Sequence, residues 1–361
     1  MNALITILDG ITETSMPFNE FVLYRARHYP NEKQILIVCG ERRDPPKVAI
    51  PNNLEIHFAG RRLSSIRKTI KSVLVACKAE KLSYAIHLHQ VQSGFLSLVA
   101  MIGTGFRKKT LFTVHSTFSG YAFHNKALSF FNAWFARCIT CVSNTSYHKY
   151  PKLIKKIKKD RIRAVQNGVD TERIDAVIDN ESRRKGSGAN FIYVARIIPL
   201  KNHAFLVRVL QKCDPKVHFI FVGAEDPDGA IRKQAQEAGV IDRITFTGLI
   251  PRNSVFAELQ AADYYVSSST LEGLPVSVLE AMYCELPCVL SDIPQHKEAA
   301  DGIASILPFD EDLWVKELNR LADMPCEERN ALGLRSRSYV TEHFSLAHMH
   351  KLYDTVYDSL R

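Results

Sequence analysis

Short β-rich runs alternate with helix-length stretches along the whole chain, and this alternation constrains the fold more than any other feature. The first half contains the runs ALITIL, QILIVC, YAIHLH, TLFTVH, CITCVS and IRAV. The second half contains NFIYVAR, VHFIFVG, ITFTG, DYYVSS and PCVLS. Strands that are each followed by a helix assemble into parallel sheets with helices on both faces. The pattern therefore predicts an α/β protein with two Rossmann-like parallel-sheet domains.

Changes in composition predict where these domains begin and end. We expect an N-terminal domain over residues 1–165, a linker rich in Gly, Ser and charge over 166–189, and a second domain over 190–340. Residues 341–361 are expected to end in a helix with one apolar face, formed by Leu346, Met349, Leu352, Tyr353, Val356 and Tyr357. Because ligands of open parallel sheets bind beyond the carboxyl ends of the strands, the loops there are predicted to face one cleft.

Length and composition indicate a globular protein. The chain has 361 residues, enough for two domains with separate cores, and its hydrophobic fraction of 46% excludes disorder. No apolar run reaches the roughly 20 residues of a membrane span, and the start MNALITILDG lacks the basic region of a signal peptide. The eight cysteines are scattered, as expected of reduced core thiols. We therefore expect a cytoplasmic protein.

Charge is divided unevenly between the two halves. Residues 1–165 carry a net charge of +17, residues 166–361 carry −8, and the segment 149–163 (KYPKLIKKIKKDRIR) concentrates the positive charge. A basic first domain favours an anionic partner, either lipid headgroups at the cytoplasmic face of the inner membrane or a diphosphate-linked acceptor. A solvated lysine-rich helix is the alternative. Nucleic acid is not expected, because no RRM, KH, zinc-finger or helix-turn-helix signature is present.

Residues 267–300 hold two carboxylates at a loop-to-helix junction. Glu272 lies in the loop after the run DYYVSS, and Glu280 lies eight residues later, about a turn and a half inside a helix that begins near Pro275. The first N–H groups of this helix suit a pyrophosphate, and a carboxylate within it can accept hydrogen bonds from the hydroxyls of a ribose. The pattern indicates a nucleotide-sugar site, and two solvated helix charges are the simpler alternative.

This stretch resembles the E-x7-E signature of the retaining glycosyltransferases of family 4, which have the GT-B fold. Glu272-Gly273-Leu274-Pro275, Glu280-Ala281-Met282 and the following ELPCV stand in the register of the family motif. Glu285 replaces a usual glycine, which we expect to alter the helix C-cap and not the chemistry. The resemblance implies two Rossmann-like domains facing across a cleft, with the C-terminal helix returning to the first domain.

The resemblance also implies roles for residues outside this stretch. Arg196 and Lys201 match the pair that holds the donor diphosphate, with Ala195 in place of a usual glycine. A fixed guanidinium and an ammonium can stabilise the negative charge that leaves with the nucleotide. Glu272 is then expected to bind hydroxyls of the donor sugar, and Glu280 the ribose.

In the first half, the resemblance indicates histidines and one glycine. His115 ends the run TLFTVH, where the family has a histidine that faces the donor sugar. His89 could line the acceptor side, and a core role for it and for His87 is the alternative. Gly10 lies in a first loop (residues 8–15) that corresponds to a glycine-rich turn near the pyrophosphate. The predicted catalytic residues are His115, Arg196, Lys201 and Glu272, and the predicted donor-binding residues are Gly10, Arg196, Lys201, Gly223, Gly248, Glu272, Gly273, Leu274, Pro275 and Glu280.

Neither a metal nor a cofactor besides the donor substrate is expected. Asp226-Pro227-Asp228 has the form of a metal-binding D-x-D, but it lacks the surroundings of the fold that uses one, so a turn is predicted. Cys138 and Cys141 have a spacing that directs them to opposite faces of a strand. Residues 103–105 (GTG) follow a helix-like stretch and do not indicate a nucleotide-binding loop.

These features predict transfer of a hexosyl unit from a nucleoside diphosphate sugar, a UDP-sugar first among them, to an acceptor hydroxyl with retention of configuration. The expected pathway is assembly of a bacterial surface polysaccharide or lipid-linked glycan. A sugar-nucleotide epimerase or a phosphorylase of the same fold is the alternative enzyme. A membrane-docked subunit that supports a partner transferase is the non-enzymatic alternative, and it would bind the donor weakly or not at all.

Overall fold

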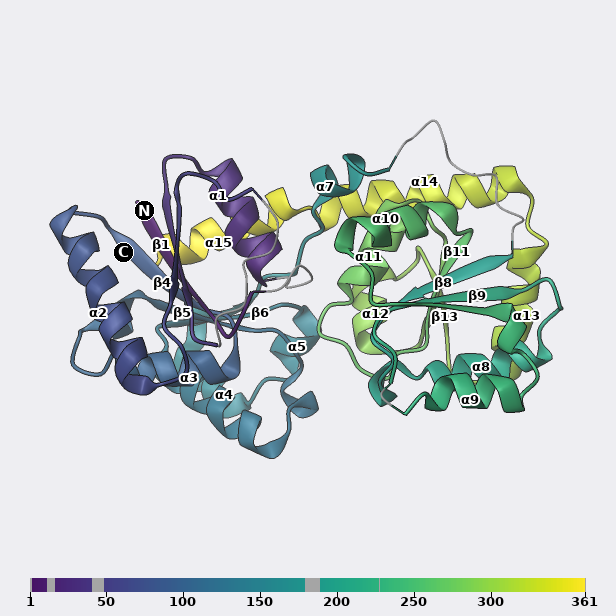
Figure 1. Cartoon of the computed structure of the whole chain (residues 1–361), viewed down its shortest axis with the longest axis horizontal. Helices are drawn as coiled ribbons and strands as arrows, with labels where there is room; N and C mark the ends of the chain where they lie inside the picture. The colour runs from purple at the N-terminus through teal and green to yellow at the C-terminus, as the bar shows by residue number, and fades with distance from the viewer. Residues whose placement is uncertain (1, 12–16, 41–48, 179–188, 227, 361) are drawn as a thin grey trace. The chain divides into compact units, whose positions relative to one another are not determined.

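The structure divides into two compact units (Figure 1). Unit 1 contains residues 1–168 and 346–361, and unit 2 contains residues 169–345. In this computed structural model the described residues are 2–11, 17–40, 49–178, 189–226 and 228–360. Half of the predicted first loop (12–15) and ten residues of the predicted linker (179–188) therefore lie outside the described residues.

Unit 1 is built on a parallel sheet of seven strands in the order β3-β2-β1-β4-β5-β6-β7. Ile5 of β1 pairs with Ile35 of β2 on one side and with Ile86 of β4 on the other, so the order of strands reverses beside β1. Ligands of such sheets bind at this reversal, outside the carboxyl ends. The strands are β1 (Ala3–Leu8), β2 (Lys33–Val38), β3 (Leu54–Phe58), β4 (Tyr84–Leu88), β5 (Thr110–Val114), β6 (Cys138–Cys141) and β7 (Ile162–Ala164).

Alternate residues of these strands face two different helical layers. Ile5 and Ile7 of β1 belong to a core cluster with residues of α2, α3 and α4, whereas Leu4 and Leu8 belong to clusters with η1, α1 and α15 on the other face. The helical elements of unit 1 are η1 (Pro17–Leu23), α1 (Tyr24–His28), α2 (Leu63–Ala79), α3 (Val91–Ala100), η2 (Phe106–Lys109), η3 (Phe118–Gly120), α4 (Phe123–Phe135), α5 (Asn144–His148), α6 (Lys152–Lys158), η4 (Lys159–Arg161) and α15 (Leu346–Asp358).

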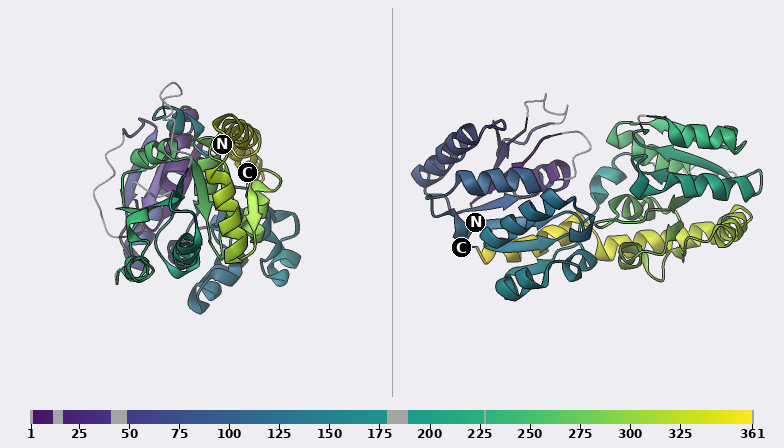
Figure 2. Two further views of the ribbon diagram at one scale, coloured as in Figure 1. Left: turned by 90° about the vertical axis from the view of Figure 1, so that its right-hand side faces the viewer. Right: turned by 90° about the horizontal axis from the view of Figure 1, so that it is seen from below.

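A row of buried polar side chains joins α15 to the sheet of unit 1. His87 Nε2 lies 2.6 Å from the Thr113 hydroxyl, and His87 Nδ1 lies 2.8 Å from the Tyr357 hydroxyl. The Tyr353 hydroxyl lies 3.3 Å from the hydroxyls of both Thr113 and Thr140. Since buried polar groups need partners, this network fixes where α15 lies on the sheet. The packing of yellow α15 along the strands of unit 1 can be followed in Figure 2.

One member of the predicted apolar stripe of α15 does not pack. Leu352 is 36% exposed, whereas Leu346, Met349 and Val356 are buried. The helix therefore presents a narrower apolar face than the sequence pattern predicts, and the hydroxyls of its tyrosines supply part of the attachment.

Unit 2 is built on a second parallel sheet, of six strands, in the order β10-β9-β8-β11-β12-β13. Here the order reverses beside β8, which pairs with β9 and β11. The strands are β8 (Asn190–Val194), β9 (His218–Val222), β10 (Ile244–Gly248), β11 (Tyr264–Ser267), β12 (Cys288–Ser291) and β13 (Ser305–Leu307).

Helices cover both faces of this second sheet. In Figure 1, α8 and α9 lie on one side of the strands, and α10 and α11 lie on the other. The helical elements of unit 2 are α7 (Thr171–Asp175), η5 (Pro199–Lys201), α8 (His203–Lys212), α9 (Ala230–Glu237), η6 (Ile241–Arg243), α10 (Arg252–Ala261), α11 (Val276–Tyr283), α12 (Pro294–Ala300), α13 (Glu311–Ala322) and α14 (Cys326–His343).

The cysteines and the helices bear on two further expectations. All eight cysteines are free thiols, and all except Cys326 are buried. None of the helices among the described residues has the length and apolar character to cross a membrane.

Candidate functional site

Lys201 and Glu272 form an ion pair at the carboxyl edge of the sheet in unit 2. Lys201 is the last residue of η5, which follows β8, and Glu272 lies in the loop between β11 and α11. The Lys201 carbonyl oxygen accepts hydrogen bonds from the Tyr193 hydroxyl at 3.0 Å and from the Ser268 hydroxyl at 3.1 Å. The two side chains are 21% and 13% exposed, so their attraction is only partly screened by water. The structure thus brings two predicted site residues together.

Glu280 is buried inside α11 and forms an ion pair with Arg252, the first residue of α10. The two side chains are 3% and 18% exposed. Burial raises the pKa of the Glu280 carboxyl, while Arg252 and Arg173 act to lower it and Asp170 acts to raise it. Arg173 is itself fixed by a hydrogen bond of 3.0 Å from its Nε to Asn253 Oδ1. The charge on Glu280 therefore depends on its two arginines.

A buried histidine links the ends of β11 and β12 in the same unit. His296 Nδ1 lies 2.8 Å from the Ser291 carbonyl oxygen, to which it can donate, and Nε2 lies 3.4 Å from the Ser267 hydroxyl. The Ser291 hydroxyl donates to the Ser269 carbonyl oxygen at 2.5 Å. Burial lowers the pKa of His296, so the ring is neutral at pH 7. This network supports the loop that leads to Glu272.

The start of α11 differs in one detail from the prediction. Pro275 is the N-cap and not the first helical residue, because its ψ of 83° is not helical, and the helix begins at Val276. Leu274 is 6% exposed and belongs to the core of unit 2. Gly273 precedes it in the loop. Contacts of these residues with a donor stay a prediction.

The end of α11 explains the departure at Glu285. Its N–H bonds to the Met282 carbonyl at 3.1 Å and the Leu286 N–H bonds to the Ala281 carbonyl at 3.0 Å, which is a Schellman C-cap. This cap places Glu285 at a φ of +62°, where glycine is favoured. A Cβ on Gly333 of α14 would lie 2.2 Å from the Glu285 carbonyl oxygen, so the two helix segments meet closely.

Three further predicted residues lie at strand ends of unit 2. Arg196 follows β8, is exposed, and has no ion pair with any described residue. Gly223 follows β9, and a Cβ there would lie 2.2 Å from the Ala195 carbonyl oxygen. Gly248 ends β10 with a φ of +68°. Both glycines thus have a backbone reason to be glycine, and their predicted contact with a nucleobase stays a prediction.

Two histidines meet at the carboxyl edge of the sheet in unit 1. His89 Nδ1 lies 3.1 Å from His115 Nε2, and their rings stack with centroids 5.3 Å apart. Phe21 of η1 packs its ring against both of them, with centroids 4.5 Å and 6.1 Å away. His89 is buried, and its Nε2 has no hydrogen-bond partner among the described residues. Burial lowers the pKa of His115 to about 4 and that of His89 well below its usual value, so both rings are neutral at pH 7.

The loop after β1 is tied to the start of α3. The Gln90 side chain accepts a hydrogen bond from the Asp9 N–H, and Asp9 Oδ1 accepts one from the Ser93 N–H at 2.8 Å. A Cβ on Gly40 would lie 1.9 Å from the Asp9 carbonyl oxygen, whereas one on Gly10 would meet no atom within 4 Å. The need for glycine is therefore steric at Gly40, and the predicted contact of Gly10 with a pyrophosphate stays a prediction.

The basic segment 149–163 uses two of its lysines inside the fold. Lys158 is 8% exposed and donates to the carbonyl oxygens of Trp134 and Ala136. Lys155 donates to the His148 carbonyl oxygen at 2.9 Å. These contacts make part of the segment structural, so it offers fewer free cations than its sequence suggests.

Sequence reasoning missed Arg252, Tyr193 and His296. Arg252 begins a helix just after the strand ITFTG, and a cation at a carboxyl edge is a signal that could have singled it out. Tyr193 and His296 carried no such signal, because each acts through backbone or serine contacts that only the fold creates. Within the predicted D-x-D turn, Pro227 lies outside the described residues. Asp226 Oδ2 accepts a hydrogen bond from the Ala230 N–H at 2.5 Å, at the start of α9.

Two protein families match this chain. "Glycosyl transferases group 1" matches residues 175–339, and "Glycosyltransferase Family 4" matches residues 21–173. EpsF of Bacillus subtilis is 27% identical over 198 residues, which are 52% of this chain and 49% of EpsF. The UDP-Gal:alpha-D-GlcNAc-diphosphoundecaprenol alpha-1,3-galactosyltransferase of Escherichia coli is 26% identical over 351 residues, 89% of this chain and 86% of the relative. The chain thus spans about half the length of the first relative and most of the second.

Solved structures support the fold. Sucrose-phosphate synthase from Thermosynechococcus elongatus superposes with a TM-score of 0.78 at 17% identity, covering 99% of this chain and 100% of that one. Anabaena Alr3699/HepE, solved with UDP and glucose, superposes with a TM-score of 0.76 at 14% identity over 99% and 100% of the two chains. The predicted fold class, GT-B with two Rossmann-like parallel-sheet domains, is confirmed.

Proposed function

Because the chain belongs to the glycosyltransferases of group 1 and family 4, we propose that it transfers a hexosyl unit from a nucleoside diphosphate sugar to an acceptor hydroxyl. The proposed reaction retains the configuration at the anomeric carbon. The observation that carries the proposal is the pair of carboxylate–cation contacts in unit 2, Lys201 with Glu272 and Arg252 with Glu280. Both involve residues of the E-x7-E motif or of the loop predicted to bind a diphosphate.

Glu280 and Glu272 are proposed to bind the two sugar rings of the donor. A buried carboxylate kept charged by Arg252 is a strong acceptor for the paired hydroxyls of a ribose. Glu272 would accept hydrogen bonds from hydroxyls of the transferred sugar once the Lys201 side chain leaves it and binds the diphosphate. Because each carboxylate has a cation beside it, the site offers both hydrogen-bond acceptors and donors to a polar ligand.

Arg196 and Lys201 are proposed to hold the diphosphate. The leaving phosphate gains negative charge as the bond to the anomeric carbon breaks, and nearby cations stabilise that charge in the transition state. Arg196 has no ion pair with a described residue to release, which suits a side chain that acts on a ligand. The leaving oxygen would take the proton of the acceptor hydroxyl, so catalysis would rest on orientation and charge stabilisation.

Neutral histidines in unit 1 are proposed to act on the sugar and the acceptor. His115 is neutral at pH 7, so it can accept or donate a hydrogen bond to a hydroxyl without adding charge. His89 would orient the ring of His115 through the contact of 3.1 Å between His89 Nδ1 and His115 Nε2. The E. coli relative is named for a diphosphoundecaprenol acceptor, which favours a lipid-linked glycan here too. The basic first half would then contact the anionic membrane surface that presents it.

The donor is tested first by thermal unfolding with UDP-, GDP-, ADP- and dTDP-sugars in the presence of EDTA. A ligand that binds the folded state raises the melting temperature by mass action, and we expect the UDP series to do so. K201A and E280Q should lose most of this shift. K233A and E237Q, which alter an exposed lysine and an exposed glutamate of α9, are the matched controls and should keep it.

Catalysis is tested with the stabilising donor and a lipid-linked acceptor. Release of the nucleoside diphosphate together with an α-linked product from an α-linked donor would support retaining transfer. Release only with inorganic phosphate would indicate a phosphorylase, and interconversion of sugar epimers would indicate an epimerase. If none of the nucleotide sugars raises the melting temperature of the folded protein, the proposal is overturned in favour of a non-catalytic subunit.

A further inference from the structure

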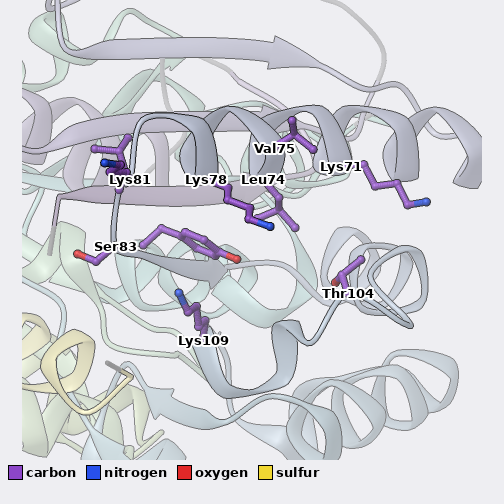
Figure 3. Close-up of a pocket in the computed structure, with 10 residues that line it drawn as sticks. Lys71, Leu74, Val75, Lys78, Lys81, Ser83, Thr104 and Lys109 are labelled. Carbon is purple, nitrogen blue, oxygen red and sulfur yellow. The ribbon is translucent and has the colours of Figure 1, made fainter.

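A basic pocket lies at the opposite edge of the sheet in unit 1 from the paired histidines. Its volume is about 730 Å³, and it lies beside the end of α2, the start of β4 and the residues before β5. Figure 3 shows Leu74 and Lys78 projecting from α2 on one side and Lys109 on the other. The lining residues are Lys71, Leu74, Val75, Lys78, Lys81, Leu82, Ser83, Tyr84, Thr104 and Lys109.

The charged side chains that line this pocket are all positive. Four of the lining residues are lysines, and the lining contains no aspartate or glutamate. None of the four forms an ion pair with a described residue, whereas nearby Lys33 pairs with Glu55 and Glu80. Like charges gathered without partners repel one another, and a bound anion would relieve that repulsion. The lining therefore favours an anionic occupant.

The floor of the pocket is less polar than its rim. Leu74, Leu82 and Tyr84 line it, and the Lys109 ammonium lies 4.0 Å from the centre of the Tyr84 ring. This cation–π contact holds the ammonium beside the pocket. Val75 at the rim is 67% exposed, and Ile102 near Thr104 is 58% exposed. An occupant should therefore combine an anionic group with an apolar or sugar-like part.

We propose that this pocket binds a phosphate-bearing ligand, with the phosphate between Lys78 and Lys109 and a less polar part over Leu74 and Tyr84. The chemistry fits two sources, the headgroup of an anionic lipid and a soluble phosphorylated molecule. The site lies at the amino ends of β4 and β5, whereas donor chemistry is proposed at carboxyl ends, so it is separate from the proposed reaction. It also differs from the basic segment 149–163, where Lys155 and Lys158 donate to backbone carbonyl oxygens.

The test compares two double variants with the same change in net charge. K78E/K109E reverses two lysines of the pocket, and K68E/K108E reverses two exposed lysines beside it, one on α2 and one next to Lys109. Both variants should fold, because the lysines have no ion pairs with described residues, and circular dichroism with thermal unfolding checks this. K78A/K109A provides a second variant without introduced acids.

Binding is measured for two probes. One is glycerol 1-phosphate by calorimetry, and the other is vesicles of phosphatidylcholine with or without about a third phosphatidylglycerol, by co-sedimentation at about 0.05 M and 0.3 M NaCl. We expect K78E/K109E to weaken binding of at least one probe about tenfold, and K68E/K108E to weaken it less than about threefold.

The outcomes separate the sources and the proposals. Weaker binding of glycerol 1-phosphate by K78E/K109E would assign a soluble phosphorylated ligand. Weaker binding of the anionic vesicles alone would assign a lipid headgroup. Equal effects of the two variants, or no binding of either probe by the native protein, would overturn the pocket as a site. The UDP-induced stabilisation should be unchanged in K78E/K109E, so a failure of the donor proposal would be seen independently.

Discussion

The carboxyl edges of the two sheets carry different kinds of polar group. In unit 2, Glu272 and Glu280 are charged groups that are each paired with a cation. In unit 1, His89 and His115 are uncharged rings packed against Phe21. The same topology thus supports a charged edge in one unit and a neutral aromatic edge in the other. The comparison shows that a parallel sheet determines where a ligand site lies, whereas burial and pairing of side chains determine its chemistry.

The strongest test of the charged edge is removal of Arg252. R252M would leave Glu280 buried without its nearest cation, which typically costs about 3 to 5 kcal/mol for a buried pair. We expect a loss at the lower end of that range, since Arg173 remains, measured by urea unfolding at pH 7.5. The double variant E280Q/R252M should be more stable than R252M, because no charge is left buried. Equal stability of R252M and the native protein would contradict the pairing.

The pH dependence of nucleotide binding sharpens the same comparison. Without Arg252, the pKa of Glu280 should rise further, because burial is then less opposed. Binding that needs the charged carboxylate should therefore weaken as pH falls, and the weakening should begin at higher pH in R252M than in the native protein. R252K should restore much of the native profile. Calorimetry with UDP between about pH 5 and pH 8 measures this.

Acid should destabilise unit 1, because its buried histidines are neutral in the folded state. Burial lowers the pKa of His115 at the carboxyl edge of the sheet to about 4, and it does the same for His350, which lies on α15 in the same unit; the usual value is near 6.5. As pH falls from about 6.5 to about 4, the unfolded chain binds protons on these rings before the folded chain does, so the free energy of unfolding falls. At pH 5.0 we expect a loss of about 2 kcal/mol for each ring relative to pH 7.5.

A variant isolates one ring of unit 1 in that experiment. His203 in unit 2 has a pKa of about 3 and acts in the same direction, so the native slope sums both units. The free energy of unfolding should therefore fall by about 2 kcal/mol less between pH 7.5 and pH 5.0 in H350N than in the native protein. Urea unfolding at the two pH values measures this difference. An unchanged slope in H350N would show that His350 is not buried in its neutral form.

A smaller effect is expected where α15 meets the sheet. Y357F removes the hydroxyl that lies 2.8 Å from His87 Nδ1 and leaves that buried nitrogen without this partner. The cost should be about 1 to 2 kcal/mol in the free energy of unfolding. Y147F, which alters a partly buried tyrosine of unit 1 whose hydroxyl has no hydrogen bond with a described residue, serves as the control for loss of a hydroxyl. Similar stability of the two variants would argue against the polar row as an attachment.

The smallest expected effect is a gain. E285G should stabilise unit 2 by up to about 1 kcal/mol, because glycine adopts the φ of +62° without the strain of a Cβ. The gain is reduced by loss of the contact of 3.4 Å between Arg337 and Glu285, whose side chains are 21% and 18% exposed. Thermal unfolding measures the change, and unchanged nucleotide affinity would support a role confined to the helix cap. A decrease in melting temperature would contradict the cap as the reason for the departure.

The strands of the two sheets could be predicted where their residues are buried on both faces. Runs such as ILIV (35–38) and FIFV (219–222) are apolar throughout because helices cover both sides. Two strands escaped prediction, β3 (Leu54–Phe58) and β13 (Ser305–Leu307). Both lie at sheet edges, where one side has no neighbouring strand, so their sequences mix polar and apolar residues or are too short to form a pattern.

The candidate site could be predicted only as far as its motif extends. Glu272, Glu280 and Lys201 carry a signal in their spacing, and the structure brings Glu272 and Lys201 together. Arg252 was missed because its partner lies 28 positions away, and no local pattern reports a contact across that distance. The pocket with Lys78 and Lys109 was missed for the same reason, since α2 and the residues before β5 meet only in the fold.

The position of α15 has a consequence for the order in which the protein is made. Unit 2 is a continuous stretch, so a ribosome delivers all of it before residue 346 appears. Unit 1 begins to emerge first, yet the row of His87, Thr113 and Thr140 stays uncovered until Tyr353 and Tyr357 arrive. Domains generally fold as units during synthesis, and the earlier one usually folds first. Here the unit that starts the chain should be the last to complete its fold, and its exposed sheet face is the surface that a chaperone would protect in the meantime.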